Sequence, residues 1–259
     1  MELQRIRLLI SYDGTDFHGW QMQTSEQPTI QSTLESALAR IFGQSVRVHG
    51  SGRTDAGAHS VGQVAHFDAP RDIASYDMRR AINRWLPNSI VVRAVWAAPR
   101  DFHSLFSAQR KTYKYWIWNH RVPSALYARY RHWVARPLDM EYLQKCSDLL
   151  LGEHDFKSFQ TAGTPIISTV RRIEKASWRR VGRHTLEFTI CGNGFLKQMV
   201  RNIVGTMLDM GRLGEAPSEM SRILTACDRQ AARASAPAHG LYLYRVEYPQ
   251  LLDSQCRKL

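Results

Sequence analysis

Polar and apolar residues alternate along some stretches of the chain and recur every three or four positions along others. Residues 5–12 alternate and stop at Asp13-Gly14, a turn signal, which predicts a strand that enters a loop. Residues 29–43 carry apolar side chains at helical spacing and end in Gly43, a residue type that commonly follows a helix. This second pattern predicts an amphipathic helix.

Four further elements follow in the first part of the chain. They are strands over 46–50 and 61–67, a short helix over 77–87 that Pro87 ends, and a strand over 89–98. The resulting order is β-α-β-β-α-β, which is typical of a ferredoxin-like unit with helices on one face of an antiparallel sheet.

The second part of the chain repeats this pattern loosely. Its predicted elements are a strand over 111–119, a helix over 139–152, strands over 168–180 and 184–191, helices over 194–210 and 217–227, and a final strand over 241–249. We therefore predict an α+β fold of two ferredoxin-like (RRM-like) subdomains, residues 1–104 and 105–259, joined near 98–109. Two such sheets are expected to meet edge to edge, with a cleft between the halves.

Composition adds a partner to this picture. The 259 residues are 44% hydrophobic, enough for a sizeable core, and 35 Lys and Arg against 23 Asp and Glu give a net charge of +12. Basic residues are interleaved with aromatic ones in residues 110–121, 129–137 and 171–180. Because unpaired bases stack on rings while phosphates meet Lys and Arg, the pattern favours single-stranded or looped RNA over a membrane surface. The alternative is that the charge only aids solubility.

Four widely spaced cysteines form no C-x-x-C pair that would indicate zinc or a redox couple. A reduced, cytoplasmic setting is the simplest inference. The apolar run near the N-terminus is too short for a signal peptide or a membrane span, so we expect a soluble protein that is not exported.

The segment GRTDAGAH, residues 52–59, is the strongest candidate for chemistry. Asp55 would project from a loop between two paired strands, a common place for catalytic groups. Arg53 supplies positive charge that favours an ionised carboxylate, which can act as a nucleophile or a base. The alternative is an aspartate chosen for turn geometry.

A metal site is the weaker hypothesis for this region. His49, His59 and His66 lie near Asp55 in sequence, but their spacing matches no familiar zinc pattern and no second carboxylate lies close by. We expect ordinary hydrogen-bonding histidines or RNA contacts. Residues 12–20, with Asp13, Asp16 and His18, are interpreted as loop geometry, since Asp-Gly after a strand is first a turn.

Two aromatic residues stand out on the strand over 111–119. Tyr113 and Tyr115 alternate with Lys114 and Trp116, so one face of the strand bears tyrosines and the other a basic and an indole group. Strand aromatics usually fill cores, and only one of the tyrosines need face a cleft.

A basic residue lies beside the apolar stripe of the helix predicted over 194–210. At about 100° per residue, Arg201 falls near the edge of that stripe, where a guanidinium can lean toward a pocket. A surface salt bridge is the alternative for the same position. No Gly-rich phosphate loop and no G-x-S-x-G motif occurs in the sequence.

Taken in order, five stretches resemble the TruA family of tRNA pseudouridine synthases over nearly the full length. They are YDGTDFHGWQMQ (12–23), GRTDAGAHSVGQVAHF (52–67), KTYKYWIWNHR (111–121), GNGFLKQMVRNIVG (192–205) and APAHGLYLYRVEYP (236–249). One such match would be weak, whereas five in the same order are highly specific. The resemblance implies two subdomains that share a central mixed, mostly antiparallel sheet, with a basic cleft.

The resemblance also implies a role for individual residues. Asp55 matches the catalytic aspartate, and Arg53 matches the residue thought to displace the target nucleotide from its stack. Tyr113 matches the tyrosine that lies against the uracil ring, and Arg201 the arginine that pairs with the catalytic carboxylate. Leu241 is expected to line the uracil pocket.

The implied activity is isomerisation of uridine to pseudouridine in the anticodon stem-loop of tRNA, at positions 38–40 in standard tRNA numbering. The implied enzyme is a homodimer that needs no cofactor and no metal. Its carboxylate can act covalently at C1′ or C6, or as a base at C2′. Two other classes compete: a non-catalytic RNA-binding or chaperone protein, and a metal-dependent nuclease that uses Asp55 with the nearby histidines.

Overall fold

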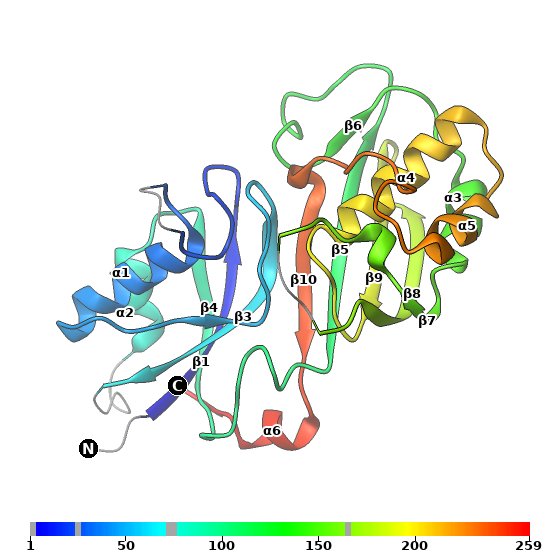
Figure 1. Ribbon diagram of the computed structural model, residues 1–259. Helices are drawn as coiled ribbons and strands as arrows, with labels where there is room; N and C mark the ends of the chain where they lie inside the picture. The colour runs from blue at the N-terminus through cyan, green and yellow to red at the C-terminus, as the bar shows by residue number, and fades with distance from the viewer. Residues whose placement is uncertain (1–3, 24–26, 71–76, 164–166) are drawn as a thin grey trace. The chain divides into compact units, whose positions relative to one another are not determined.

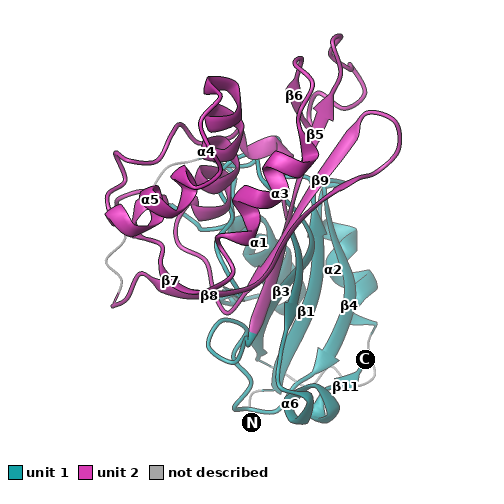
Figure 2. Cartoon of the chain, turned by 90° about the vertical axis from the view of Figure 1, so that its right-hand side faces the viewer, with its two compact units in different colours: residues 1–109, 243–259 teal, residues 110–242 magenta. Residues whose placement is uncertain are grey.

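The computed structural model describes residues 4–23, 27–70, 77–163 and 167–259, and the chain divides into two compact units. Unit 1 consists of residues 1–109 and 243–259, and unit 2 of residues 110–242 (Figure 2). Both ends of the chain therefore belong to the same unit.

Unit 1 has the predicted β-α-β-β-α-β order (Figure 1). Its elements are β1 (Gln4–Tyr12), α1 (Ile30–Phe42), β2 (His49–Gly50), β3 (His59–Ala69), α2 (Met78–Trp85), β4 (Ile90–Ala97), α6 (Gln250–Gln255) and β11 (Arg257–Lys258). The antiparallel strands follow the order β11-β4-β1-β3, and β2 pairs with β3. The short elements α6 and β11 were not predicted, because six and two residues carry too little pattern to identify an element.

The core of unit 1 lies between this sheet and its two helices, which cover the same face of the sheet (Figure 1). Alternate residues of β1, Ile6, Leu8 and Ile10, are fully buried there together with Leu34 and Leu38 of α1. The period of two in the strand and of nearly four in the helix thus place their apolar side chains in one layer, as the sequence predicts.

The ends of α1 and α2 follow from single residues. The Thr29 side chain accepts a hydrogen bond from the Ser32 backbone at the start of α1, and Gly43 ends this helix at φ 73°. Glycine suits that position because left-handed backbone costs it nothing. Helix α2 ends at Trp85, and Leu86 is extended because the following Pro87 disfavours helical geometry in its neighbour.

Unit 2 is also a sheet with helices. Its elements are β5 (Arg110–Asn119), β6 (His132–Val134), α3 (Met140–Asp148), β7 (Gly152–Asp155), β8 (Val170–Arg180), β9 (Thr185–Gly192), α4 (Met199–Leu213), α5 (Glu219–Ala226), and 3₁₀ helices at Lys157–Phe159 and Ala238–Gly240. Strands β5, β9, β8 and β7 pair in this order and antiparallel, while β6 pairs parallel to β5. Helices α3, α4 and α5 lie to one side of these strands (Figure 2).

The predicted α+β class, with a mixed but mostly antiparallel strand arrangement, is confirmed. Strand β10 (Leu241–Glu247) starts in unit 2 and ends in unit 1. A sheet shared by both halves and a cleft between them concern the placement of the two units, and both stay predictions.

One helix begins later than its sequence pattern indicates. We predicted a helix from residue 194, but α4 starts at Met199. The preceding Gln198 has left-handed backbone at φ 59°, and its side chain accepts a hydrogen bond from Thr161 Oγ1 at 2.7 Å. The apolar residues Phe195 and Leu196 continue the helical spacing but lie in the irregular segment before the helix.

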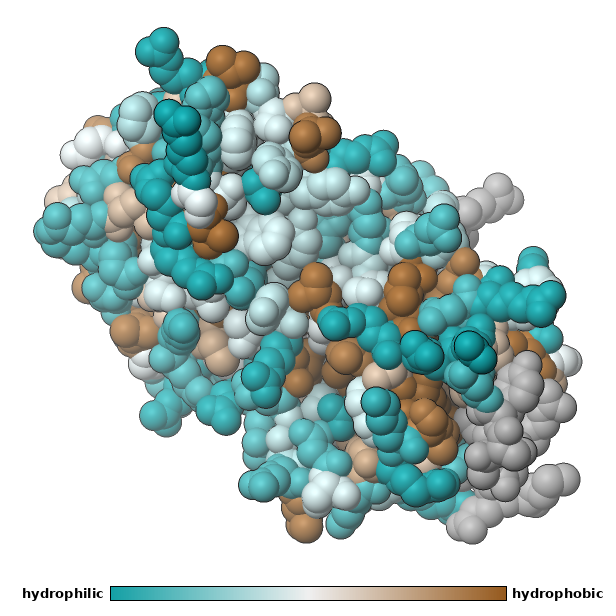
Figure 3. Space-filling view, turned by 180° about the vertical axis from the view of Figure 1, so that it is seen from behind, coloured by the Kyte–Doolittle hydropathy of each residue, from teal (hydrophilic) through white to brown (hydrophobic). Residues whose placement is uncertain are grey.

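The surface agrees with the high content of charge. Hydrophilic residues, in teal, predominate on the face that Figure 3 shows, and hydrophobic ones form smaller groups between them. No helix in the described part of the chain has the length and hydropathy needed to cross a membrane.

Candidate active site

Asp55 lies in the loop between β2 and β3, as the sequence predicts. These strands pair antiparallel, with His49 opposite His66 and Gly50 opposite Ala65, so they hold both ends of the loop. Asp55 is half-buried, whereas Arg53 is exposed. The carboxylate therefore lies on a short loop anchored in the sheet of unit 1.

The backbone of residues 14–20 holds this loop from one side. The Trp20 N–H donates to the Thr54 carbonyl at 3.1 Å, and the Gly57 N–H donates to the Phe17 carbonyl at 3.3 Å. Within the loop, the Ala58 N–H donates to the Asp55 carbonyl at 3.1 Å and closes a tight turn. The loop geometry is thus fixed by main-chain hydrogen bonds on both sides of Asp55.

Two glycines allow this close approach. A Cβ on Gly14 would lie 1.9 Å from the Ala58 carbonyl oxygen, and one on Gly19 would lie 2.6 Å from the Thr54 carbonyl oxygen. Gly19 also has φ +85°, which L-residues rarely adopt. We interpreted the 12–20 segment only as loop geometry; the structure shows that this loop supports the candidate catalytic loop.

A buried polar network lies under the same loop. The Tyr12 hydroxyl is 2.8 Å from Thr54 Oγ1, and Gln63 Nε2 donates to the Gly52 carbonyl at 3.0 Å. Ser51 Oγ in turn donates to Gln63 Oε1 at 2.6 Å. Burial raises the pKa of Tyr12 to about 12, so its hydroxyl keeps its proton at neutral pH.

Arg53 extends toward the loop before α1. Its Nε donates to Gln21 Oε1 at 3.2 Å, and Gln21 Nε2 donates to Gln31 Oε1 at 2.8 Å. The exposed guanidinium is therefore held at the side of the loop that faces solvent, two residues from Asp55.

The histidines of this region have structural partners. His59 Nδ1 accepts from the Gly14 N–H at 3.1 Å, and His66 Nδ1 accepts from the Ser104 N–H at 3.2 Å. Among the described residues, no group of three or more His, Cys, Asp or Glu is placed to hold a metal ion. Asp13 Oδ1 accepts from the Thr15 N–H at 3.0 Å, which confirms that Asp13 forms the turn expected there.

The side chains of β5 divide between the two faces of the strand as predicted. Tyr113 and Tyr115 are buried, while Lys114 and Trp116 lie on the opposite, partly exposed face. The Tyr113 ring meets Phe195 edge-on at 4.9 Å and is 7% exposed. Tyr115 is fully buried and donates its hydroxyl to the Pro237 carbonyl at 2.8 Å, and burial raises its pKa. Tyr113 is thus the tyrosine with residual accessibility.

Arg201 connects α4 to the segment that precedes β10. Its Nε donates to the Ala236 carbonyl at 2.8 Å, and the Ala236 N–H donates back to the Arg201 carbonyl at 3.0 Å. The side chain is half-buried, in agreement with a position at the edge of the apolar stripe. Leu241, the first residue of β10, is 5% exposed. Unit 2 therefore contains Tyr113, Arg201 and Leu241, and unit 1 contains Arg53 and Asp55.

The sequence did not identify a buried ion cluster on β9. Glu187 is 2% exposed and accepts hydrogen bonds from Arg179 Nε at 2.6 Å, Trp116 Nε1 at 2.9 Å and Lys114 Nζ at 3.1 Å. Burial opposes its ionisation, but these donors outweigh burial and hold the pKa of Glu187 below its usual value. No local signal marked this cluster, because the alternation of polar and apolar residues along β9 assigns Glu187 to the polar face.

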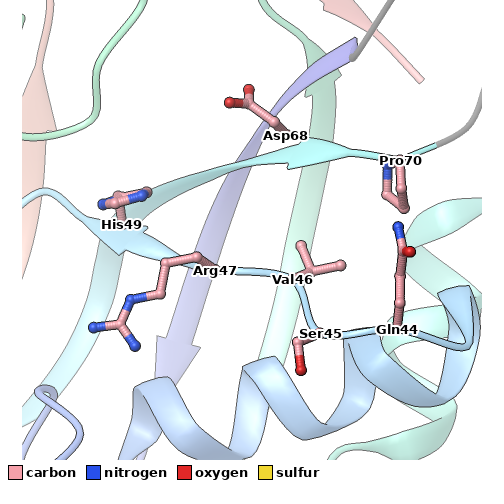
Figure 4. Close-up of a pocket in the computed structure, with 7 residues that line it drawn as sticks. All are labelled: Gln44, Ser45, Val46, Arg47, His49, Asp68 and Pro70. Atoms are coloured by element: carbon pink, nitrogen blue, oxygen red, sulfur yellow. The ribbon is translucent and has the colours of Figure 1, made fainter. Parts of the chain in front are cut away.

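A surface pocket of about 260 Å³ lies elsewhere in unit 1 (Figure 4). Residues 44–47, His49, Asp68 and Pro70 line it, and none of the loop residues 52–59 does. Asp68 is ion-paired with Arg5 at 2.8 Å. This pocket is therefore not part of the candidate site.

Comparisons with known proteins point in one direction. A sequence model of a family described as tRNA pseudouridine synthase matches residues 8–107 and 147–249. The chain is 49% identical to tRNA pseudouridine synthase A of Bdellovibrio bacteriovorus, with 98% of this chain and 99% of that protein covered. It is 46% identical to the protein of the same name from Maridesulfovibrio salexigens, with 95% and 91% covered, and 43% identical to that from Brevibacillus brevis, with 95% and 100% covered.

Proposed function

Because this chain belongs to the tRNA pseudouridine synthase family, we propose that it isomerises uridine to pseudouridine in tRNA with Asp55 as the catalytic carboxylate. The proposed targets are uridines of the anticodon stem-loop, at positions 38–40 in standard tRNA numbering. The observation that carries the catalytic assignment is the Asp55 loop itself, a half-buried carboxylate held by main-chain bonds on both sides.

The reaction suits a single fixed carboxylate. The N1–C1′ bond of uridine breaks, the uracil rotates, C5 joins C1′, the proton on C5 is lost and N1 takes up a proton. Nothing is oxidised and no group is imported, so one oxyanion beside the sugar and the base edge is sufficient. Attack at C1′, attack at C6 and proton abstraction at C2′ each use one oxygen of Asp55.

The remaining site residues have supporting roles in this proposal. A base stacked in a helical arm must be flipped out at a cost of a few kcal/mol before a carboxylate can reach it. Arg53, exposed on the same loop, fills the space that the nucleotide leaves. Tyr113 lies against the uracil ring, Arg201 pairs with the Asp55 carboxylate, and Leu241 lines the uracil pocket.

The organisation of the molecule completes the proposal. The N-terminal subdomain, residues 1–104, supplies the catalytic loop, and the C-terminal subdomain, residues 105–259, completes a basic cleft on a shared sheet. The enzyme works in the cytoplasm as a homodimer and without a cofactor. Light scattering of the purified protein should give twice the mass of 29.8 kDa.

Release of tritium from tRNA that carries C5-tritiated uridine tests the catalytic assignment. With chelator present and no added cofactor, the wild-type protein should release tritium, whereas Asp55→Asn should bind tRNA and release none. Asp16→Asn, which neutralises an exposed aspartate in the neighbouring loop, is the matched control and should keep wild-type release.

Two outcomes would contradict the assignment. Full release by Asp55→Asn would remove Asp55 from the chemistry. Binding of tRNA by the wild-type protein with no tritium release from any tRNA would favour the non-catalytic RNA-binding alternative, and RNA cleavage that stops with chelator would favour the nuclease.

A further inference from the structure

One end of the unit 2 sheet combines rings and arginines with an absence of acids. We call residues 118–133 and 180–184 the strand-end surface, because they adjoin the ends of β5, β6, β8 and β9 at the same end of the unit 2 strands (Figure 2). The sequence contains no Asp or Glu over residues 102–138 or over 175–186. The positive charge of these stretches is therefore not cancelled by acids adjacent to it in the sequence.

The rings of the strand-end surface form one cluster. The Trp118 ring centre lies 5.3 Å from those of Tyr127 and His184, and His120 lies 4.4 Å from His184. The Asn119 N–H donates to the His184 carbonyl at 2.8 Å and so joins β5 to the turn after β8. Segments far apart in the sequence are therefore held together in a fixed arrangement.

Arginines surround this cluster. The Arg131 guanidinium lies 3.5 Å from the centre of the Tyr127 ring, which is a cation–π contact. Arg121, Arg180 and Arg183 are exposed, and Arg180 Nη1 donates to the Arg183 carbonyl at 3.3 Å. Three guanidinium groups thus face solvent within one surface.

One large ring of this surface is open to solvent. Trp133 is 44% exposed, and its Nε1 donates to the His120 carbonyl at 2.8 Å, which fixes the edge of the indole and leaves the ring partly accessible. A fixed, accessible ring beside guanidinium groups fits an unpaired base next to its phosphate. The surface also exposes the apolar side chains of Val122 and Leu126, which are 61% and 82% exposed, so a second copy of the chain is the competing occupant. That copy would bring the same positive charge, which opposes self-association here.

We propose that the strand-end surface is an RNA-contact surface that binds phosphates and an unpaired base of the tRNA at nucleotides other than the reacting one. This inference rests on the proposed function for the choice of tRNA as the RNA. It assigns a binding task to Arg121, Trp133, Arg180 and Arg183, none of which has a role in the reaction proposed above.

The first test compares two variants that each lose three arginines, one from the strand-end surface and one from α2. The variant Arg121→Ala/Arg180→Ala/Arg183→Ala alters the strand-end surface, and Arg79→Ala/Arg80→Ala/Arg84→Ala removes three exposed arginines from α2. In tRNA binding titrations, the first variant should raise Kd at least tenfold near 0.1 M salt and reduce the slope of log K against log salt by about 2. The α2 variant, with the same net charge, should stay within about twofold of the wild type. Circular dichroism of both variants checks the fold.

The second test examines the ring. Trp133→Leu should weaken tRNA binding roughly tenfold at every salt concentration, because base stacking depends less on salt than phosphate contacts do. Trp133→Phe keeps an aromatic ring and should bind tRNA nearly as tightly as the wild type.

The outcomes separate this proposal from the one before it. The RNA-contact surface would be overturned if the triple strand-end variant kept the wild-type Kd and salt slope, or if the α2 variant weakened tRNA binding equally. It would also be overturned if the triple strand-end variant changed its mass in light scattering but not its Kd for tRNA. Tritium release by the wild-type protein is measured in parallel and reports on the proposed function alone. Loss of binding in the strand-end variant supports the surface whichever nucleotides the enzyme modifies.

Discussion

The surroundings of the candidate site residues are held mainly by the main chain in unit 1 and mainly by side chains around β5 in unit 2. In unit 1, the Asp55 loop is fixed by main-chain hydrogen bonds, and Gly14 and Gly19 let the two backbones touch. In unit 2, the strand that carries Tyr113 is held by side chains in addition to strand pairing, because the Glu187 carboxylate of β9 accepts hydrogen bonds from two residues of β5 and one of β8. A loop held by close main-chain contacts should be destabilised by substitutions that add side-chain atoms, whereas a side-chain network should be destabilised by substitutions that remove them.

The largest effect is expected from one methyl group in unit 1. In Gly14→Ala the new Cβ would lie 1.9 Å from the Ala58 carbonyl oxygen, and only a backbone shift relieves this overlap. We expect a loss of about 3 kcal/mol in the free energy of unfolding. We also expect a fall of about a hundredfold in the single-turnover rate of tritium release, because Asp55 is displaced. Urea denaturation and the tRNA assay measure the two effects, and a wild-type rate would contradict the backbone-held picture.

Removal of the Glu187 carboxylate is the matching experiment in unit 2. Glu187→Ala leaves Lys114, whose side chain is 12% exposed, without its carboxylate partner. The variant should lose about 3 kcal/mol in urea denaturation. Since the pKa of Glu187 is lowered in the fold, its contribution is present above the ordinary carboxyl value of 4.5 and disappears as pH falls through the lowered pKa. The difference from the wild type should shrink accordingly in acid.

Glu174→Ala is the control on the neighbouring strand β8. Glu174 forms a surface ion pair with Arg110 at 3.3 Å, and both side chains are more than a third exposed. We expect a change below about 1 kcal/mol. Equal losses in the two variants would show that burial of Glu187 is not what makes its network important.

A smaller, pH-dependent effect is expected from His66, a buried side chain of β3 in unit 1. Burial, followed by the neighbouring charges of His103, Arg5 and His49, lowers its pKa to about 3. In the unfolded chain this group gains a proton below about pH 6.5, so the folded state loses stability from there down to about pH 3. Between pH 6.5 and 5 this amounts to about 2 kcal/mol.

His66→Gln isolates that contribution. The variant lacks the titrating ring, so its free energy of unfolding should fall less than that of the wild type between pH 6.5 and 5. Thermal or urea denaturation at both pH values gives the comparison, and parallel pH profiles would rule out His66 as the source.

The smallest effect is expected from Gly43→Ala, which serves as a comparison for Gly14→Ala. Gly43 has φ +73°, but a Cβ there would meet nothing within 4 Å. Gly43→Ala should cost about 1 kcal/mol through backbone strain and leave tritium release unchanged. A large loss of activity in this variant would mean that any disturbed glycine in unit 1 affects the loop.

Local pattern was sufficient for most of the fold. The helical spacing before Gly43 and the alternation in β1 predicted elements that the structure confirms, because burial on one face leaves a period in the sequence. The late start of α4 was missed because a single left-handed residue, Gln198, interrupts a pattern that remains apolar. The two-residue strand β11 has no period to detect.

The position of Asp55 in the fold could be predicted from the sequence, whereas the contacts that hold its loop could not. The motif around Asp55 indicated a loop between paired strands, which the structure confirms. The contact of Gly14 and Gly19 with this loop joins segments some forty residues apart, and no local pattern reports such a contact. Glu187 was missed for the same reason, since its donors come from two other strands.

The division of unit 1 between the two ends of the chain has a consequence for biosynthesis. A ribosome delivers β1 to β4 first, then the whole of unit 2, and only afterwards β11, which pairs with β4. Until then the Leu243 carbonyl that accepts the Ser60 hydroxyl does not exist, nor does the Asp253 partner of Arg7. Unit 1 therefore starts to be translated before unit 2 but is completed after it. A nonsense codon shortly before residue 243 would remove the partners of β3 and β4 and destabilise the N-terminal strands.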